Sequence, residues 1–112
     1  ISPFQKALGP EDLENVCVRL KDNLHFGHIS GFDASTKQYK VVLEMNGMVE
    51  YHSSDEFDLV PPAKKDKVLI LADPYFLASG TLIGIDGDER IVKIFGSGEI
   101  RILPAKCIAK LF

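Results

Sequence analysis

The feature of this sequence that most constrains its fold is an internal repeat. Phe26–Asp33 and Ser79–Asp86 share two glycines, an apolar residue and a final aspartate at the same spacing, with an offset of 53 residues. Further downstream the offset is 51 residues, in the pairs Val41/Val92, Leu43/Ile94, Gly47/Gly98 and Val49/Ile100. The change in offset falls between Asp33 and Tyr39, which predicts a longer hairpin tip in the first copy. A repeat of about 50 residues predicts two copies of one small module, with little room for a deep catalytic cleft.

The composition is that of a soluble globular chain. Its 112 residues are 46% apolar and 26% charged, and no stretch approaches the roughly 18 apolar residues of a membrane span. The chain begins at Ile1 without a basic and apolar leader, so we expect a piece of a longer protein. Cys17 and Cys107 occupy non-equivalent positions of the two copies, which favours unpaired thiols over a disulfide framework.

Alternating apolar and polar residues predict short β-strands in both copies. In the first copy these are Val16–Leu20, Gly27–Phe32, Tyr39–Glu44, Met48–Tyr51 and Phe57–Val60, and in the second Lys67–Ala72, Gly80–Asp86, Ile91–Phe95, Glu99–Leu103 and Cys107–Leu111. The glycines of the second strand of each copy predict a bend or bulge. Asn46-Gly47 is typical of a type I′ hairpin turn, in which both residues have positive φ. Ser53–Glu56 predicts a capped single turn.

Five short strands with a one-turn helix before the last strand predict an SH3-like barrel. We therefore expect an all-β chain of two tandem SH3-like barrels, at residues 13–61 and 65–112. A lead-in at residues 1–12, with one short helical turn at most, precedes them, and a proline-containing linker at residues 62–64 joins them.

Motifs for catalysis are absent from the sequence. His25 and His28 are the only close pair of histidines and have no third ligand at a metal spacing. The glycine-rich segment Gly80–Gly87 lacks the spacing of a phosphate-binding loop. The sequence therefore predicts a protein that is not an enzyme and that uses no metal and no cofactor.

The two halves of the chain differ in charge. Through Val60 there are five basic and ten acidic residues, a net charge of −5, whereas the remainder has eight basic and six acidic residues, a net charge of +2. Cations beside an aromatic pair suit weak contacts with the phosphates and bases of single-stranded RNA. The candidate nucleic-acid or partner-binding residues are Lys64, Lys65, Lys67, Tyr75, Phe76, Arg90 and Arg101.

Aromatic residues of the first copy offer an alternative site. Phe26, Tyr39 and Tyr51 surround a predicted rim of strands and loops, and such rings can hold a methylated lysine through cation–π attraction. The alternation also places Tyr39 and Tyr51 on apolar faces, which favours core positions for both. A methyl-lysine cage and a core role are both open at this stage.

Much of the chain resembles one family of transcription elongation factors. Residues 65–71, 78–87, 91–94 and 100–111 resemble the last KOW module of the large subunit of eukaryotic DSIF, in the NusG-related family. Val18–Asp22 and Ser53–Pro62 resemble the preceding module and its exit, so the similarity covers about Leu13 to Leu111. Gly27 and Gly80 fall at the glycine of the KOW motif.

The resemblance implies KOW-type barrels in a non-catalytic nuclear protein. The implied partners are the RNA polymerase II elongation complex, the small DSIF subunit through the parent protein, nascent RNA and elongation-associated proteins. We expect no membrane partner and a monomeric chain. The alternative is a tandem Tudor reader of methylated histone lysine, because Gln38–Glu50 resembles a Tudor hairpin and Asp73–Phe76 has a parallel in Tudor pairs.

Overall fold

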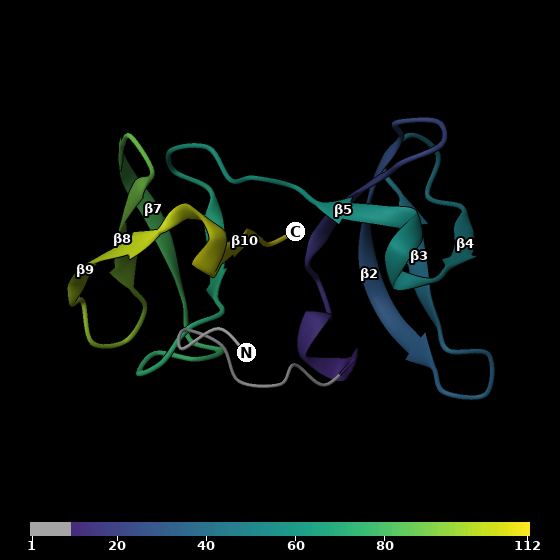
Figure 1. The fold of residues 1–112 in the computed structure, drawn as a ribbon, viewed down its shortest axis with the longest axis horizontal. Helices are drawn as coiled ribbons and strands as arrows, with labels where there is room; N and C mark the ends of the chain where they lie inside the picture. The colour runs from purple at the N-terminus through teal and green to yellow at the C-terminus, as the bar shows by residue number, and fades with distance from the viewer. Residues whose placement is uncertain (1–9) are drawn as a thin grey trace. The chain divides into compact units, whose positions relative to one another are not determined.

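The computed structural model describes residues 10–112, and these form an all-β protein (Figure 1). The strands of the first copy are β1 (Cys17–Leu20), β2 (Phe26–Asp33), β3 (Gln38–Leu43), β4 (Val49–His52) and β5 (Phe57–Leu59). Those of the second copy are β6 (Lys67–Ile70), β7 (Ser79–Asp86), β8 (Glu89–Ile94), β9 (Ile100–Pro104) and β10 (Ile108–Lys110). Single 3₁₀ turns lie at η1 (Pro10–Leu13), η2 (Ser54–Glu56) and η3 (Ala105–Cys107). Each predicted strand is found, with ends that differ by about two residues or less.

The strands form two antiparallel sheets of five strands each. The first has the order β4-β3-β2-β1-β5 and the second the order β10-β6-β7-β8-β9, which is the same topology in each copy. The described residues divide into two compact units, one of residues 10–60 together with Phe112 and the other spanning Pro61–Leu111. No helix among the described residues is long and apolar enough to cross a membrane.

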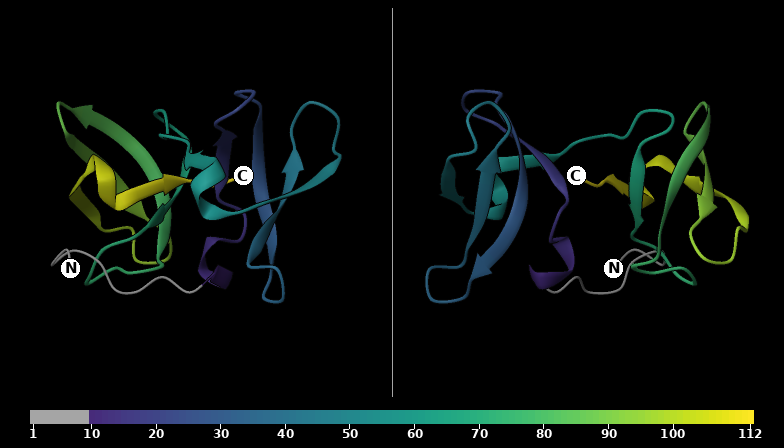
Figure 2. Two further views of the ribbon diagram at one scale, coloured as in Figure 1. Left: turned by 45° about the vertical axis from the view of Figure 1, so that its right-hand side comes forward. Right: turned by 180° about the vertical axis from the view of Figure 1, so that it is seen from behind.

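The longest strand of each sheet carries the predicted bulge. The register between β2 and β3 shifts between Ile29 and Gly31, and that between β7 and β8 shifts between Leu82 and Gly84. In Figure 2 both β2 and β7 curve along their length, as bulged strands do. A Cβ at Gly27 would lie 2.6 Å from the Val42 carbonyl oxygen, so the neighbouring backbone leaves room only for glycine.

Each sheet packs its alternating apolar residues into one buried cluster. The first cluster consists of Val18, Leu20, Ile29, Tyr39, Val41, Leu43 and Phe57, and the second of Val68, Ile70, Leu82, Val92, Ile94 and Ile108. The predicted core equivalents Val41/Val92 and Leu43/Ile94 are all buried, which confirms the repeat at the level of packing.

The hairpin prediction for Asn46-Gly47 is wrong in detail. Of the two residues, only Gly47 has a positive φ, at 71°. The Leu43 amide donates a hydrogen bond to Met48 O at 2.8 Å, and the Gly47 amide donates one to Leu43 O at 2.8 Å. The loop between Leu43 and Met48 therefore has four residues instead of two. The Asn46 side chain accepts from the Met48 amide at 2.9 Å. The two-residue signal fails because that asparagine oxygen and the glycine together close a wider turn.

The β2–β3 and β7–β8 hairpins account for the change in repeat offset. Asp33 pairs with Gln38 across a tip of residues 34–37, whereas Asp86 pairs with Glu89 across residues 87–88. The ladder on both sides of each tip is in the equivalent register. The predicted longer tip of the first copy is therefore confirmed.

Candidate functional site

Tyr75 joins a polar cluster at the rim of the second core. It lies in the loop between β6 and β7, is half-buried, and packs against the buried residues of its unit. Its hydroxyl accepts a hydrogen bond from Arg101 Nε at 2.6 Å and donates one to Glu99 Oε2 at 3.0 Å. The Arg101 guanidinium also lies 5.4 Å from the centroid of the Tyr75 ring and pairs with Glu99. Tyr75 thus forms one connected group with Glu99 and Arg101, which lie 24 and 26 residues further along the chain.

The charge of this cluster is already partly balanced. The hydrogen bond to the Tyr75 hydroxyl, reinforced by Glu99, raises the pKa of Arg101 above its already high ordinary value. A phosphate that bound Arg101 would have to displace Glu99 from its ion pair with this residue. Because an exposed ion pair contributes little free energy, the exchange of one such pair for another would give little gain in binding. Arg101 and Tyr75 therefore present an ordered surface whose positive charge is largely neutralised by Glu99.

The aromatic pair Tyr75-Phe76 is only partly exposed. Both side chains are half-buried, and Tyr75 has Arg101 over its ring and the core beneath it. The alternation of apolar and polar residues could not predict this packing, because the loop between β6 and β7 has no such pattern.

The three lysines of the predicted site lie on another part of the second unit. Lys64 and Lys65 occupy the turn before β6, and Lys67 is the first residue of that strand; all three are exposed. The Lys65 amide donates to Leu82 O at 2.7 Å, which fixes this turn against β7.

Lys67 shares the outer face of the sheet with a second lysine, Lys93. The cross-strand register runs from Lys67 to Thr81 and from Thr81 to Lys93. Residues directly opposite one another share a face, so Thr81 lies between two lysines. Beside them is a depression of about 370 Å³ lined by Thr81, Lys93, Ile94, Phe95, Gly96 and Gly98. No pattern in the sequence indicates Phe95 as a site residue, and the register of β7 and β8 is what brings Lys93 beside Thr81.

Arg90 and Arg101 do not join the lysines. Lys93 pairs with Ile100, so the next residue, Arg101, points to the opposite face of β9. Arg90 Nη1 donates to Gly87 O at 2.7 Å and to Glu89 O at 3.0 Å, which uses this guanidinium to hold the β7–β8 turn. The predicted seven-residue site is thus two separate surfaces and one structural arginine.

The three aromatic residues of the alternative cage do not share a face. Tyr39 is only 9% exposed and its ring packs against Phe32 and Phe57, with centroids at 4.8 and 5.5 Å. Tyr51 is opposite Lys40, the next position along β3, so it points away from Tyr39. The cage of Phe26, Tyr39 and Tyr51 is therefore wrong as a set, because strand alternation buries one ring and exposes another.

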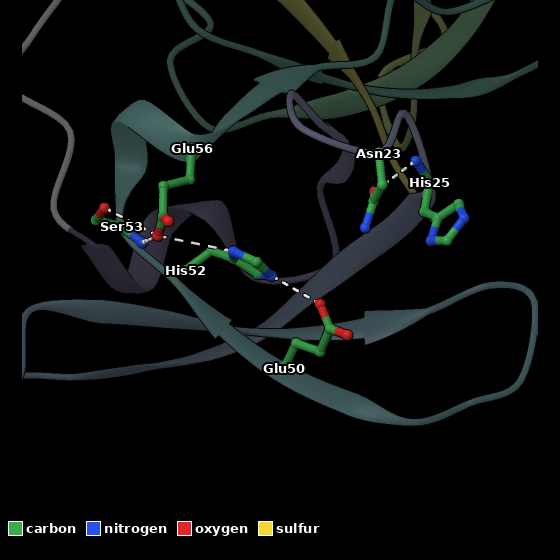
Figure 3. Close-up of polar contacts among 6 residues, drawn as sticks. All are labelled: Asn23, His25, Glu50, His52, Ser53 and Glu56. Atoms are coloured by element: carbon green, nitrogen blue, oxygen red, sulfur yellow. Dashed lines mark hydrogen bonds and ion pairs between the residues drawn. The ribbon is translucent and has the colours of Figure 1, made fainter.

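His52 lies between two glutamates of the first unit (Figure 3). Its Nε2 lies 2.9 Å from Glu50 Oε1, and its Nδ1 lies 3.7 Å from Glu56 Oε1. The Ser53 amide donates to the same Glu56 oxygen at 2.7 Å, which confirms the predicted capped turn. His52 thus connects β4 to η2. The His25 amide donates to Asn23 Oδ1 at 3.0 Å in the β1–β2 connection.

Groups able to coordinate a metal ion do not gather in the described part of the chain. No three histidine, cysteine, aspartate or glutamate residues of positions 10–112 are placed to hold a metal ion. What the structure brings together is a cationic outer face and an arginine–tyrosine–glutamate rim, both of which suit binding.

Comparison with known proteins relates the second unit to one family. Residues 60–111 match the family of the seventh KOW domain of transcription elongation factor SPT5. The Arabidopsis thaliana protein named transcription elongation factor SPT5 homolog 1 is 42% identical over 55 residues, which are 49% of this chain and 5% of that protein. The chain thus spans a small part of the relative that it matches.

Among solved structures, two of the SAWADEE domain of SHH1 are similar to this chain. One is a selenium-substituted mutant of the Arabidopsis thaliana domain, with 10% identity over 85% of this chain and 96% of the other. The second is a complex with an H3K9me3 peptide, with 11% identity over 86% of this chain and 97% of the other. Both have a TM-score of 0.37, which is too low to carry an argument about fold or function.

Proposed function

We propose that the chain is a non-catalytic docking module of the RNA polymerase II elongation complex, because its second unit is similar to a KOW module of the SPT5 transcription elongation factor family. The match of residues 60–111 to an SPT5 KOW domain is the observation that supports this role most strongly. The proposed site of action is the nucleus. The small DSIF subunit would be met through the parent protein and not through these residues.

Each sheet is proposed to close into an SH3-like barrel. The first barrel spans residues 13–61 and the second 65–112, with residues 62–64 as linker and residues 1–12 as lead-in; residues 1–9 lie outside the described part. The support is the strand order, the bulged second strand and the single turn before the last strand in each copy. Such a module offers its surface for binding and has no deep cleft.

The contact proposed for nascent RNA is the cationic outer face of the second unit. Lys67 and Lys93 flank Thr81 there, and Lys64 and Lys65 lie in the turn that leads into β6. A net charge of +2 in this half and −5 in the other favours phosphate contacts only on the second unit. With so few free cations, the affinity should be about 10⁻⁴ to 10⁻⁶ M at physiological salt.

The test is fluorescence anisotropy of a labelled single-stranded RNA, in parallel with a purified RNA polymerase II elongation complex on a nucleic-acid scaffold. Three phosphate contacts give a slope of about −2 in a plot of log affinity against log salt. Replacing Lys64, Lys65 and Lys67 together by glutamine should flatten this slope and weaken binding. The matched control replaces Arg19 and Lys21 of the acidic unit and should have little effect.

Two results would overturn the proposed role. One is equal loss of RNA binding in the lysine variant and in the control. The other is no binding to RNA or to the elongation complex, together with micromolar binding of a methylated histone peptide, which would favour the Tudor-type reader.

A further inference from the structure

The first unit has an apolar depression at a corner between two loops. It encloses about 490 Å³ and is lined by Leu24, His25, Phe26, Glu44 and Met45. Leu24, Phe26 and Met45 are 59%, 47% and 66% exposed, so its apolar walls are open to solvent. These residues come from the β1–β2 connection, the first residue of β2 and the start of the β3–β4 loop.

The backbone at this corner holds an apolar side chain outward in an unfavourable conformation. Leu24 has a φ of 60°, in the left-handed region that bulky residues seldom occupy. Its amide donates to Leu20 O at 3.0 Å, which fixes the turn. Glycine or asparagine would form such a turn at less cost, so the fold alone does not explain a leucine here.

The second unit has the same feature at the equivalent position. Leu77 has a φ of 66°, is 38% exposed, and follows Leu24 at the repeat offset of 53 residues. Both copies thus have an exposed leucine with a left-handed backbone conformation at the same position of the repeat. This repetition indicates a role at the surface.

Each corner also has one exposed phenylalanine, but at non-equivalent positions of the two copies. In the first unit the Glu44 amide donates to Phe26 O at 2.9 Å, and in the second the Phe95 amide donates to Ser79 O at 2.9 Å. Phe26 is therefore equivalent to Ser79, and Glu44 to Phe95. The exposed phenylalanine thus begins β2 in the first copy and follows the end of β8 in the second, and both corners have an exposed ring.

We propose that the first corner docks a short segment of a partner protein that carries one bulky aliphatic side chain flanked by lysine or arginine. The aliphatic side chain would fill the space between Leu24, Phe26 and Met45. The cation would pair with Glu44, which forms no ion pair within residues 10–112. The proposal rests on the interaction role inferred above.

Charge selects a basic partner for this corner. Asp22 is exposed in the loop that carries Leu24, and the half of the chain through Val60 has a net charge of −5. A nucleic acid would bring phosphates against Glu44 and Asp22, which disfavours it. The second corner has Phe95 in place of Glu44, so the preference for a cation belongs to the first.

The test is an NMR titration of the ¹⁵N-labelled chain with three synthetic peptides. The first has a central Lys-Leu-Lys, the second has alanine in place of the leucine, and the third has glutamates in place of the lysines. We expect the first to shift amides of residues 22–27 and 44–46. The alanine and glutamate peptides should each bind at least about tenfold more weakly, which equals about 1.4 kcal/mol.

Variants of the chain sharpen the assignment. Phe26→Ala should weaken the Lys-Leu-Lys peptide by about tenfold, and Glu44→Gln should reduce the salt dependence of its binding. Tyr51→Ala is the matched control, because Tyr51 is 50% exposed but does not line the depression, and it should change nothing. If Phe26→Ala does not fold, Phe26→Ser replaces it, since serine occupies the equivalent position 79.

Four outcomes would overturn the proposal: no saturable shift at the corner, equal binding of the alanine peptide, no effect of Phe26 substitution, or displacement by single-stranded RNA at the same amides. RNA binding at Lys64, Lys65 and Lys67 is measured on the same sample. A failure at the corner is thereby distinguished from a failure of the role proposed for the second unit.

Discussion

Replacing Gly27 by alanine should destabilise the first unit through a clash with its neighbouring strand. The added Cβ would lie 2.6 Å from Val42 O, 2.9 Å from Val41 Cγ1 and 3.3 Å from the Val42 carbonyl carbon. Two of these three atoms belong to the backbone of β3. They cannot move away without disturbing the pairs Gly27↔Leu43 and His28↔Val42.

The size of the effect follows from two opposing contributions. Overpacking in a well-packed site costs about 1–3 kcal/mol. Alanine recovers about 0.5–1 kcal/mol relative to glycine because the unfolded chain has less freedom to lose. We expect Gly27→Ala to lower the free energy of unfolding by about 1–2 kcal/mol, and the melting temperature by roughly 4–8 °C per kcal/mol.

Gly31→Ala in the same strand is the matched control. No atom lies within 4 Å of a Cβ built there, so this change should be neutral or stabilising by about 0.5 kcal/mol. The chain has no tryptophan, so unfolding in urea is best followed by NMR peak intensities of each unit. Equal destabilisation by both alanines, or none by Gly27→Ala, would refute the close-approach explanation of this glycine.

Two further changes test the polar contacts. Tyr75→Phe keeps the ring but removes the hydroxyl shared by Arg101 and Glu99, so urea denaturation should show a loss of about 0.5–1 kcal/mol in the second unit; no change would mean that this group is not formed in solution. Hydrogen bonds from the hydroxyl and amide of Ser35 lower the pKa of Asp33 below its ordinary 3.8, so the stabilisation by this carboxylate is complete above the ordinary value and is lost as the pH falls through the lowered pKa. Ser35→Ala should return the carboxyl midpoint toward 3.8 in a ¹³C titration, and an unchanged midpoint would contradict this cause.

The strands could be predicted from sequence because their signals are local. Alternation such as that of Val16–Leu20 and punctuation by glycine and proline fix an extended segment before any partner is known. The repeat supports the prediction further, because the same order of strands and turns is found twice in the sequence. The four-residue closure at Glu44–Gly47 could not be read this way, because it depends on the bond between Leu43 and Met48 across the finished hairpin.

The binding surfaces were less accessible to sequence reasoning because register and loop packing create them. Lys67 and Lys93 become near neighbours only through Thr81, and Arg101 leaves their face because Ile100 occupies the position opposite Lys93. Tyr75 lies in a loop, where no periodicity reports burial. Residue type indicates which cationic and aromatic side chains could bind a partner, whereas the register of the strands determines which of them lie on the same face.

The unequal hairpin tips show where this chain tolerates a change in length. Residues 34–37 replace a two-residue tip with a four-residue tip, and yet the pairs that flank it, Asp33↔Gln38 and Asp86↔Glu89, are equivalent. Loop closure grows only slowly in entropic cost with added residues. A fluorophore-binding tag or a protease site introduced at residues 34–37 or 87–88 should therefore leave both sheets intact, which makes these tips the natural positions for probes of each unit.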